Sequence, residues 1–255
     1  MLADVHVHTN FSCDSETDME SYINKALDDN CSYLCFTDHV DFNKIDYGYG
    51  YYSSERFFRE FTCIKNKFSS NGDLCILSGI EFSEPHLYKK ELYDLEQLPY
   101  DYIIGSVHWV RDMFPCKEVK ARYTAKEFYD WYWQEILKAV TAGGFDCLGH
   151  IDFPKRYFNE VCYDSSLLST IFNTMIKNNI VLEINTSSIR KGVSETMPGE
   201  ELLNIYKQCG GKFVTIGSDA HETEDLFAEY NTAQALIKNL GLVQVVFIKR
   251  KMKII

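Results

Sequence analysis

Short apolar segments alternate with amphipathic segments along almost the whole of this 255-residue chain. The apolar segments are rich in β-branched and aromatic residues, which is typical of buried strands, and a helical pattern follows each of them. Strands are predicted around residues 4–8 and at 31–37, 74–78, 100–106, 145–149, 180–184 and 212–217, with a final edge strand at 243–248. This alternation predicts an α/β fold with a parallel sheet.

A parallel sheet of this kind closes most simply into an α/β barrel. The alternative is an open doubly wound sheet, but the pattern G-x-G-x-x-G that marks a dinucleotide site after the first strand is absent. The chain length suits one barrel, and the sequence contains no linker, repeat or low-complexity segment. We therefore expect residues 1–255 to form a single domain.

Helices are predicted between the strands. Thr124 and Glu127 form a capping-box pattern at the start of the longest one, and Gly143 and Gly144 are expected to end it. The glycine- and tyrosine-rich segment 42–52 and the segment 111–122 are expected to be loops. The predicted helices cover residues 18–30, 54–69, 87–98, 124–142, 165–177, 199–209 and 225–239.

Charge and cysteine content limit the partners and the compartment. The formal net charge is -11 and the pI is about 5.1, which argues against a nucleic-acid partner. The nine cysteines include no C-x-x-C pair and lie mostly in apolar segments, which is typical of reduced thiols in a cytoplasmic protein. The sequence shows neither a signal pattern nor an apolar run of the roughly 20 residues that cross a bilayer. We expect a cytoplasmic protein with no membrane partner.

Six of the seven histidines stand at or just after the carboxyl end of a predicted strand. In a parallel barrel these ends converge on one mouth, and Asp38, Glu81 and Asp219 fall at the same level. Divalent ions take several N/O ligands, and two neighbouring ions need a bridging carboxylate, for which Glu81 is the candidate. The sequence therefore predicts a multi-metal site. The six histidines are His6, His8, His39, His108, His150 and His221.

A single histidine in an apolar strand is more often a buried structural residue than a ligand, so the prediction depends on the joint pattern. His86 does not follow a strand and is expected to lie in a loop. Asp38 is expected to fix a histidine ring rather than to bind an ion. The basic segment 249–253 is expected to be a solvated tail.

The order of these segments resembles the PHP (polymerase and histidinol phosphatase) superfamily over essentially the whole chain. The resemblance implies a distorted (β/α)7 barrel with a trinuclear metal site at the carboxyl ends of the strands. Within the superfamily, HIDFPKR at 150–156 and EINTSSIR at 183–190 resemble the monofunctional histidinol-phosphate phosphatases. The wider match comprises VHVHT at 5–9, TDH at 37–39, GIE at 79–81, SVH at 106–108, GH at 149–150 and SDAH at 218–221.

The resemblance also implies which residues hold each ion. Many relatives have a histidine at the position of Asp14, where a carboxylate is still a competent ligand; the alternative is a loop-capping role. The same ligand types suit Zn, Mn and Fe, so two or three divalent ions are expected. The first ion is assigned to His6, His8, Glu81 and Asp219, the second to Glu81, His108 and His150, and the third to Asp14, His39 and His221.

The implied reaction is hydrolysis of a small-molecule phosphomonoester, most directly L-histidinol phosphate to L-histidinol and phosphate in histidine biosynthesis. A hydroxide bridging the first two ions would attack phosphorus, with Glu81, Asp219 and His221 as the candidate catalytic residues. The alternatives are a PHP phosphoesterase for nucleotides, sugar phosphates or phosphotyrosine, and a catalytically silent module that binds metal.

The substrate is expected to contact both basic and polar side chains. Arg156 and Arg190 are candidates to bind phosphate because a guanidinium can grip it with two hydrogen bonds; the alternative is that both are surface arginines. Asn185 is a candidate to bind substrate or to fix a ligand. The ammonium and imidazole groups of histidinol are expected to meet Tyr47, Tyr49, Tyr51, Glu84 or Asp152.

Overall fold

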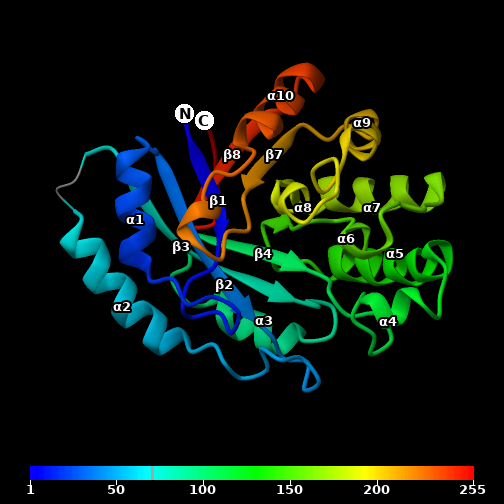
Figure 1. Cartoon of the computed structure of the whole chain (residues 1–255), viewed down its shortest axis with the longest axis horizontal. Coiled ribbons are helices and arrows are strands. Elements are labelled where there is room, and N and C mark those ends of the chain that lie inside the picture. Colours follow the sequence, from blue (N-terminus) through cyan, green and yellow to red (C-terminus); the bar gives the residue numbers. More distant parts are fainter. Residues whose placement is uncertain (70–71) are drawn as a thin grey trace.

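Seven parallel strands follow one another in chain order around a central core, and helices cover their outer side (Figure 1). This computed structural model describes residues 1–69 and 72–255. Every neighbouring pair from β1 to β7 is parallel, which confirms the α/β fold. The strands are β1 Ala3–Val7, β2 Tyr33–Val40, β3 Cys75–Ser83, β4 Tyr102–Ser106, β5 Cys147–Leu148, β6 Val181–Asn185 and β7 Phe213–Gly217.

The two ends of this series, β1 and β7, meet at a loose seam. The Asp219 amide donates to the His6 carbonyl at 2.8 Å, and the His8 amide donates to the Ala220 carbonyl at 2.9 Å. Ladder pairing there is reduced to one bridge between Val7 and Ala220, so the sheet does not close through a continuous ladder. The barrel is therefore distorted, and its seam brings β1 next to Asp219.

The helices form where the amphipathic segments predicted them. The capping box of Thr124 and Glu127 is present, and α5 ends at Gly143, whose φ of 68° is a conformation that glycine adopts easily. A short helix, α4, lies in the segment 111–122 that was expected to be only a loop. The helices are α1 Met19–Asp28, α2 Ser54–Lys67, α3 Lys89–Glu96, α4 Lys117–Lys120, α5 Ala125–Ala142, α6 Lys155–Phe158, α7 Ser165–Lys177, α8 Ser187–Arg190, α9 Glu200–Gln208 and α10 Tyr230–Leu240, with a 3-10 turn at Thr223–Asp225.

Strands β2 and β3 extend further than their apolar segments suggested. Their ladder runs without a break from Tyr33 opposite Cys75 to Val40 opposite Phe82. Asp38, His39 and Glu81 therefore lie within strands and not after them. The reason is that parallel pairing continues through polar residues when both neighbours supply backbone partners.

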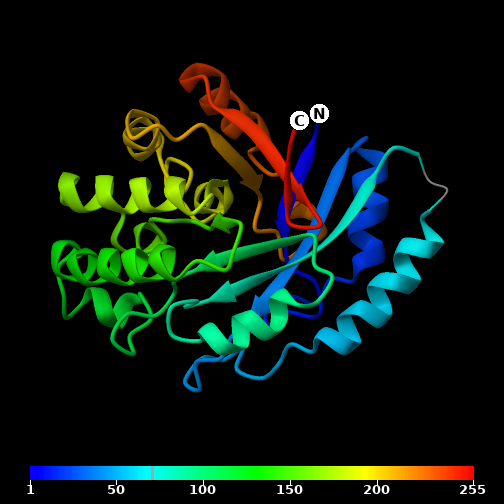
Figure 2. The same ribbon diagram turned by 180° about the vertical axis from the view of Figure 1, so that it is seen from behind.

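A hairpin at the carboxyl end of the chain extends the sheet. Strand β8 (Val243–Ile248) is parallel to β7, and β9 (Lys251–Ile254) is antiparallel to β8, so β8 is not the edge strand that was predicted. Figure 2 shows this hairpin in red, with the two chain ends side by side. The Phe247 ring stacks on Tyr102 at 5.4 Å between centroids.

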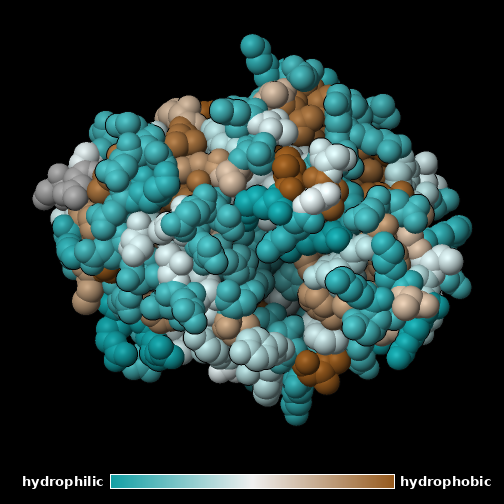
Figure 3. Space-filling model, viewed as in Figure 1, coloured by the Kyte–Doolittle hydropathy of each residue, from teal (hydrophilic) through white to brown (hydrophobic). Residues whose placement is uncertain are grey.

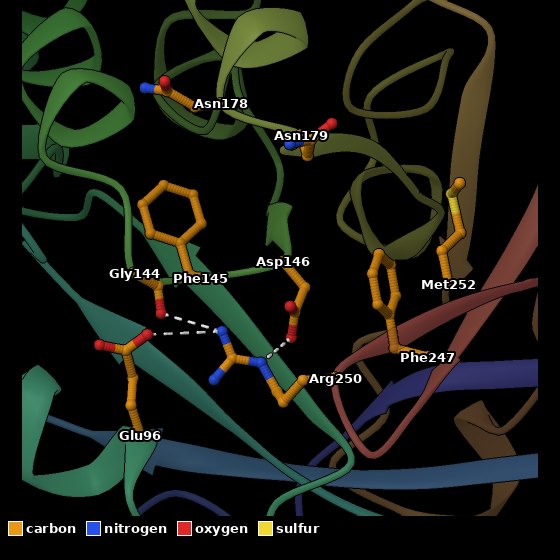
Figure 4. A pocket seen from close by; sticks show the side chains of 9 residues that line it. All are labelled: Glu96, Gly144, Phe145, Asp146, Asn178, Asn179, Phe247, Arg250 and Met252. Atoms are coloured by element: carbon orange, nitrogen blue, oxygen red, sulfur yellow. Dashed lines mark hydrogen bonds and ion pairs between the residues drawn. The ribbon is translucent and has the colours of Figure 1, made fainter.

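Arg250 fastens the hairpin to the amino ends of the strands, as Figure 4 shows. Its guanidinium contacts the Asp146 carboxylate at 2.5 Å, the Gly144 carbonyl at 3.1 Å and the Glu96 carboxylate at 3.7 Å. A cavity of about 370 Å³ lies there. The expectation of a tail at 249–253 is therefore wrong, because strand pairing and this ion pair fix the segment, although Lys251, Met252 and Lys253 are solvent-exposed as expected.

An apolar layer inside the barrel supports the mouth. Cys35 and Leu77 belong to a buried cluster separate from the larger core between strands and helices. Alternate residues of a strand share a face, so Cys35 lies on the face of His39 and Leu77 on the face of Glu81. The polar groups at the mouth are thus built on a packed base.

The surface in the view of Figure 3 is mostly hydrophilic, with hydrophobic residues scattered in small groups. Among the described residues, we find no helix with the length and apolar character needed to cross a membrane.

Candidate metal centre

Nine nitrogen- and oxygen-bearing side chains converge at the carboxyl ends of the strands. Most of them are buried, whereas Asp14, His39 and His221 have side chains that are 44%, 17% and 29% exposed. They come from β1, β2, β3 and the segments after β1, β4, β5 and β7. The set predicted from sequence is thus gathered in one place: His6, His8, Asp14, His39, Glu81, His108, His150, Asp219 and His221.

Glu81 stands at the centre and uses its two oxygens differently. Oε1 faces the Nε2 atoms of His150 at 2.8 Å and His108 at 3.5 Å. Oε2 faces His39 Nδ1 at 3.0 Å, and the Nε2 atoms of His6 and His8 at 3.3 and 3.6 Å. A carboxylate with a separate group of nitrogens at each oxygen has the arrangement that a bridge between two ions needs.

Asp219 lies beside the two histidines of the first segment, His6 and His8. Its Oδ1 lies 3.2 Å from His8 Nε2 and 3.9 Å from His6 Nε2, while its Oδ2 accepts from Arg156 Nη2 at 2.6 Å. Asp219 and His150 have φ angles of 55° and 22°, a region that residues other than glycine rarely adopt and that is found at functional sites. The seam between β1 and β7 therefore aims the carboxylate at the histidines.

Asp14 lies beside the two most exposed histidines of the group. Its Oδ2 is 3.1 Å from His221 Nε2 and 3.5 Å from His39 Nε2. The His221 ring also stacks on His8 at 4.3 Å between centroids. Asp14 is thus within reach of an ion held by His39 and His221.

The electrostatics keep the central carboxylates ionised. Burial alone would raise the pKa of Glu81, but the charges of His39 and His6 and hydrogen bonds from His108 and His150 hold it well below its usual value. Burial alone would also raise the pKa of Asp219, but the charges of Arg156 and His6 outweigh this effect and hold it well below its usual value. Burial and the neighbouring imidazoles of His39 and His221 lower the pKa of His8 to about 3. Metal binding requires anionic carboxylates and neutral imidazoles, and His8 meets this condition. Burial would lower the pKa of His6 and His39 as well, but the surrounding carboxylates outweigh it and raise both, so these two rings lose a proton when an ion binds.

Several buried atoms at the centre have no hydrogen-bond partner among the described residues. They include the Nε2 atoms of His6 and His8, Nδ1 of His39 and Oε2 of Glu81. Buried polar groups are normally paired, and ligation of an ion would satisfy these atoms. The donor set of imidazole nitrogens and carboxylate oxygens therefore fits divalent ions.

Side chains behind the site orient the histidine rings. Glu183 Oε1 lies 2.6 Å from His6 Nδ1, and Glu183 Oε2 accepts from the His150 amide at 2.8 Å. Because Nδ1 of His6 is engaged, its Nε2 is left for a ligand. We did not predict Glu183 from the sequence, although a charged residue in the apolar strand VLEIN was a usable signal.

Two serines also orient histidine rings of the cluster. Ser12 Oγ lies 3.1 Å from His8 Nδ1 and donates to Asp38 Oδ1 at 3.0 Å, while Ser83 Oγ lies 3.1 Å from His108 Nδ1. Asp38 therefore acts on a histidine through Ser12 and not directly. His86 lies in a loop away from the cluster and contacts Glu135 at 2.8 Å.

The cluster opens into a cavity of about 730 Å³, which we call the site cavity. Arg156 and Arg190 both line it. Arg156 Nη2 donates to Asp219 and Ser187, and Arg190 Nη2 donates to the carbonyls of Ser218 and Asp219 at 2.9 and 3.1 Å. Arg190 Nε faces Asp225 Oδ1 at 3.1 Å, and the buried Nη1 has no hydrogen-bond partner among the described residues.

Asn185 lies behind the cavity and is fully buried. Its Nδ2 donates to Glu183 Oε2 at 3.2 Å and to Asp219 Oδ2 at 3.4 Å, and its Oδ1 accepts from Ser187 Oγ at 2.6 Å. It therefore fixes neighbouring side chains, among them the candidate ligand Asp219, which is one of the two roles predicted for it.

Only one of the five residues expected to meet the organic part of a substrate, Tyr47, lines the site cavity. Glu84 accepts from the amides of His108 and Trp109 at 2.8 and 3.0 Å. Asp152 forms a buried ion pair with Lys155. Both carboxylates therefore already have partners within the protein. The cavity lining instead includes Asp41, Asp46, Trp109 and Phe114, whereas Tyr49 and Tyr51 lie outside it.

Comparison with known proteins agrees with this geometry. The family model described as PHP domain matches residues 4–187, which include seven of the nine clustered side chains. The chain belongs to the PHP domain family. A probable histidinol-phosphatase of Clostridium acetobutylicum is 30% identical to this PHP-domain protein over 266 residues, covering 99% of both chains.

A solved PHP-domain structure has the same fold. The crystal structure of histidinol phosphate phosphatase from Lactococcus lactis, complexed with zinc, L-histidinol and phosphate, matches with a TM-score of 0.88 and 25% identity. The match covers 99% of this chain and 98% of that one. A putative histidinol phosphatase of Listeria monocytogenes matches with a TM-score of 0.74 and 19% identity, covering 90% of this chain and 99% of the other. The distorted barrel expected from the sequence is thereby confirmed.

Proposed function

We propose that this protein is a metal-dependent phosphoric monoester hydrolase that converts L-histidinol phosphate to L-histidinol and phosphate, as in histidine biosynthesis. The observation that carries the proposal is that seven of the nine clustered side chains and both arginines line the same cavity. The full-length similarity to histidinol-phosphatases supports this substrate.

We assign two or three divalent ions, Zn, Mn or Fe, to three groups of ligands. Such ions supply a water nucleophile near neutral pH and neutralise charge on the phosphoryl oxygens. Glu81 joins the first two groups through its separate oxygens, and Asp14 serves the third. The groups are His6, His8, Glu81 and Asp219; Glu81, His108 and His150; and Asp14, His39 and His221.

The arginines bind and orient the phosphoryl group. Arg190 lines the cavity with its Nη1 unpaired among the described residues, and Arg156 is held beside the cluster by Asp219 and Ser187. Two guanidinium groups from different segments fix a tetrahedral anion in one orientation, which is a large part of phosphoryl-transfer catalysis. His221, exposed at the mouth and beside Asp219, is placed to contact the reacting group.

Acidic residues in the cavity lining favour a cationic alcohol over a nucleotide. Asp41 and Asp46 both line the cavity, and their carboxylates lie close to Gly48. Trp109 donates from Nε1 to Asp46 at 2.5 Å and offers an aromatic face. Acidic groups and an aromatic ring suit an ammonium and an imidazole, whereas they repel additional phosphates.

The proposal is tested by measuring phosphate release from a panel of phosphomonoesters. The protein is treated with a chelator and then reconstituted with Zn, Mn or Fe, and histidinol phosphate is compared with nucleotides, sugar phosphates and phosphotyrosine. We expect metal-dependent turnover with histidinol phosphate as the preferred ester. Turnover of another ester in its place would reassign the substrate, and inactivity of metal-replete protein on every ester would indicate a silent metal-binding module.

A further inference from the structure

Lys155 is a charged residue that is almost completely buried, with 2% of its surface exposed. Its ammonium group contacts Asp152 Oδ2 at 2.7 Å and Glu195 Oε1 at 3.1 Å, and donates to the Thr196 carbonyl at 2.6 Å. Two of these contacts, to Glu195 and Thr196, are hydrogen bonds, and the third, to Asp152, is a close ion pair without an aligned hydrogen bond. The geometry is that of a three-point clamp.

The clamp joins two segments that are distant in the sequence. One segment contains Asp152 and α6, in which Lys155 is followed directly by Arg156. The other contains Glu195 and Thr196, and is fixed to the end of β6 because the Asn185 and Met197 backbones exchange two hydrogen bonds of 2.9 Å.

The second segment is also the one that carries Arg190. Helix α8 (Ser187–Arg190) follows β6, and Ser188 Oγ donates to the Glu195 carbonyl at 2.6 Å, which ties α8 to the clamped residues. Lys155 therefore connects the helix of Arg156 to the helix of Arg190 on the side away from the site cavity. The clamp residues do not line that cavity.

We propose that Lys155 is a positioning residue that fixes the separation of Arg156 and Arg190 and thereby sets the affinity of the site for a phosphoryl group. The inference rests on the proposed function in taking these two arginines as the phosphate-binding pair. Arg156 and Arg190 grip one anion from two segments, so a shift of α6 against α8 changes both sets of hydrogen bonds at once.

Stability alone does not explain why a lysine occupies this position. Removing an ammonium and a carboxylate from water costs about as much as their attraction returns, so apolar side chains of similar size hold a fold together at least as well. What the lysine adds is direction, because one ammonium group donates to Glu195 and Thr196 and is paired with Asp152, which restricts the arrangement of the two segments.

The test uses two variants of the full-length, metal-loaded protein. Lys155→Met removes the ammonium but leaves Asp152 unpaired, and Lys155→Met with Asp152→Asn also removes that buried charge. Lys138→Met is the matched control, because Lys138 makes the same i,i+3 contact to a carboxylate at 2.8 Å but is 58% exposed. The measurements are the Kd of inorganic phosphate by calorimetry, KM and kcat for histidinol phosphate, metal content and melting temperature.

We expect the double variant to keep its metal content while the Kd of phosphate and the KM of the ester rise by about ten- to a hundredfold. The fall in kcat at saturating ester should be smaller than the rise in KM, and the control should match the wild type. A folded, metal-replete double variant that binds phosphate like the wild type would overturn the proposal and leave Lys155 a purely structural residue.

A third variant keeps the test decisive if the buried substitutions prevent folding. Glu195→Gln removes only the arm of the clamp that is 48% exposed, and we expect a rise in phosphate Kd of about two- to fivefold. An unchanged Kd would overturn the proposal. If the wild type binds phosphate but does not hydrolyse histidinol phosphate, the proposed function fails while the Kd comparison still decides the role of Lys155; no phosphate binding by the wild type would overturn both.

Discussion

Glu183 shows how one residue behind the site controls a candidate ligand. Its Oε1 holds His6 Nδ1 at 2.6 Å, which fixes the ring with Nε2 directed at Glu81. We expect Glu183→Gln to weaken metal binding by about ten- to a hundredfold, because losing the anionic partner lowers the basicity of the imidazole. Metal content after competition with a chelator measures this effect.

Glu135→Gln is the control for that experiment. Glu135 forms a carboxylate–histidine pair with His86 at 2.8 Å, outside the metal cluster. It should leave metal affinity unchanged. Equal metal retention by Glu183→Gln and the wild type would show that Glu183 does not support the site.

Arg190 separates phosphate binding from metal binding. Its Nη2 donates to two backbone carbonyls and its Nε faces Asp225 at 3.1 Å, so it contacts the cluster without pairing to a candidate ligand side chain. Arg190→Ala should raise KM for the ester by about ten- to a hundredfold through loss of charge-assisted hydrogen bonds, with metal content intact. Arg122→Ala, at an exposed arginine, is the control for steady-state kinetics. Loss of metal in Arg190→Ala would mean that Arg190 supports the cluster itself.

At the scale of elements, the turn between β1 and α1 supplies the most exposed part of the cluster. Asp14 is 44% exposed and contacts only the exposed edges of His39 and His221. We expect Asp14→Ala to lose about one ion per chain while the ions at Glu81 remain, because an ion needs about four ligands. Elemental analysis of dialysed protein checks this, with Asp28→Ala on the exposed end of α1 as the control. Full metal retention would assign Asp14 to loop capping.

The hairpin of β8 and β9 contributes to the stability of the barrel and not to catalysis. Arg250 holds it through Asp146, which is only 8% exposed. Arg250→Ala removes the ion-pair partner of that carboxylate and leaves it only the Ile103 amide, and we expect the free energy of unfolding to fall by about 1–3 kcal/mol. Urea denaturation measures the loss, and kcat should stay close to the wild-type value because the hairpin lies at the opposite end of the strands. A large fall in kcat with unchanged stability would contradict this division.

For the whole molecule, we propose that residues 1–255 unfold as one domain whose stability depends on bound ions. The ligands come from strands around most of the barrel, so an ion held at the mouth binds the native chain and not the unfolded one. At a free ion concentration of about a hundred times Kd, the melting temperature should rise by about 5–10 °C. Thermal unfolding with chelator or added metal, followed by two spectroscopic probes, tests both points. Two transitions, of which only one responds to metal, would contradict the single domain.

The sequence by itself determined the class of fold and the place of the chemistry. Strand and helix periodicities are local, so the alternation predicted a parallel barrel, and histidines such as His6, His108 and His150 at strand ends predicted a mouth rich in metal ligands. Parallel strands bring those ends together whatever the helices between them contain. The family resemblance then assigned the roles.

Only the tertiary structure decided which side chains support these groups. Glu183 meets His6 across 177 residues, and Lys155 meets Glu195 and Thr196 across two separate segments. Arg250 was expected in a tail, yet it forms an ion pair with Asp146. Such contacts depend on how the barrel closes and how its loops pack, and no local pattern encodes those distances. The physical reason is that periodicity sets the face on which a residue lies, whereas packing chooses its partner.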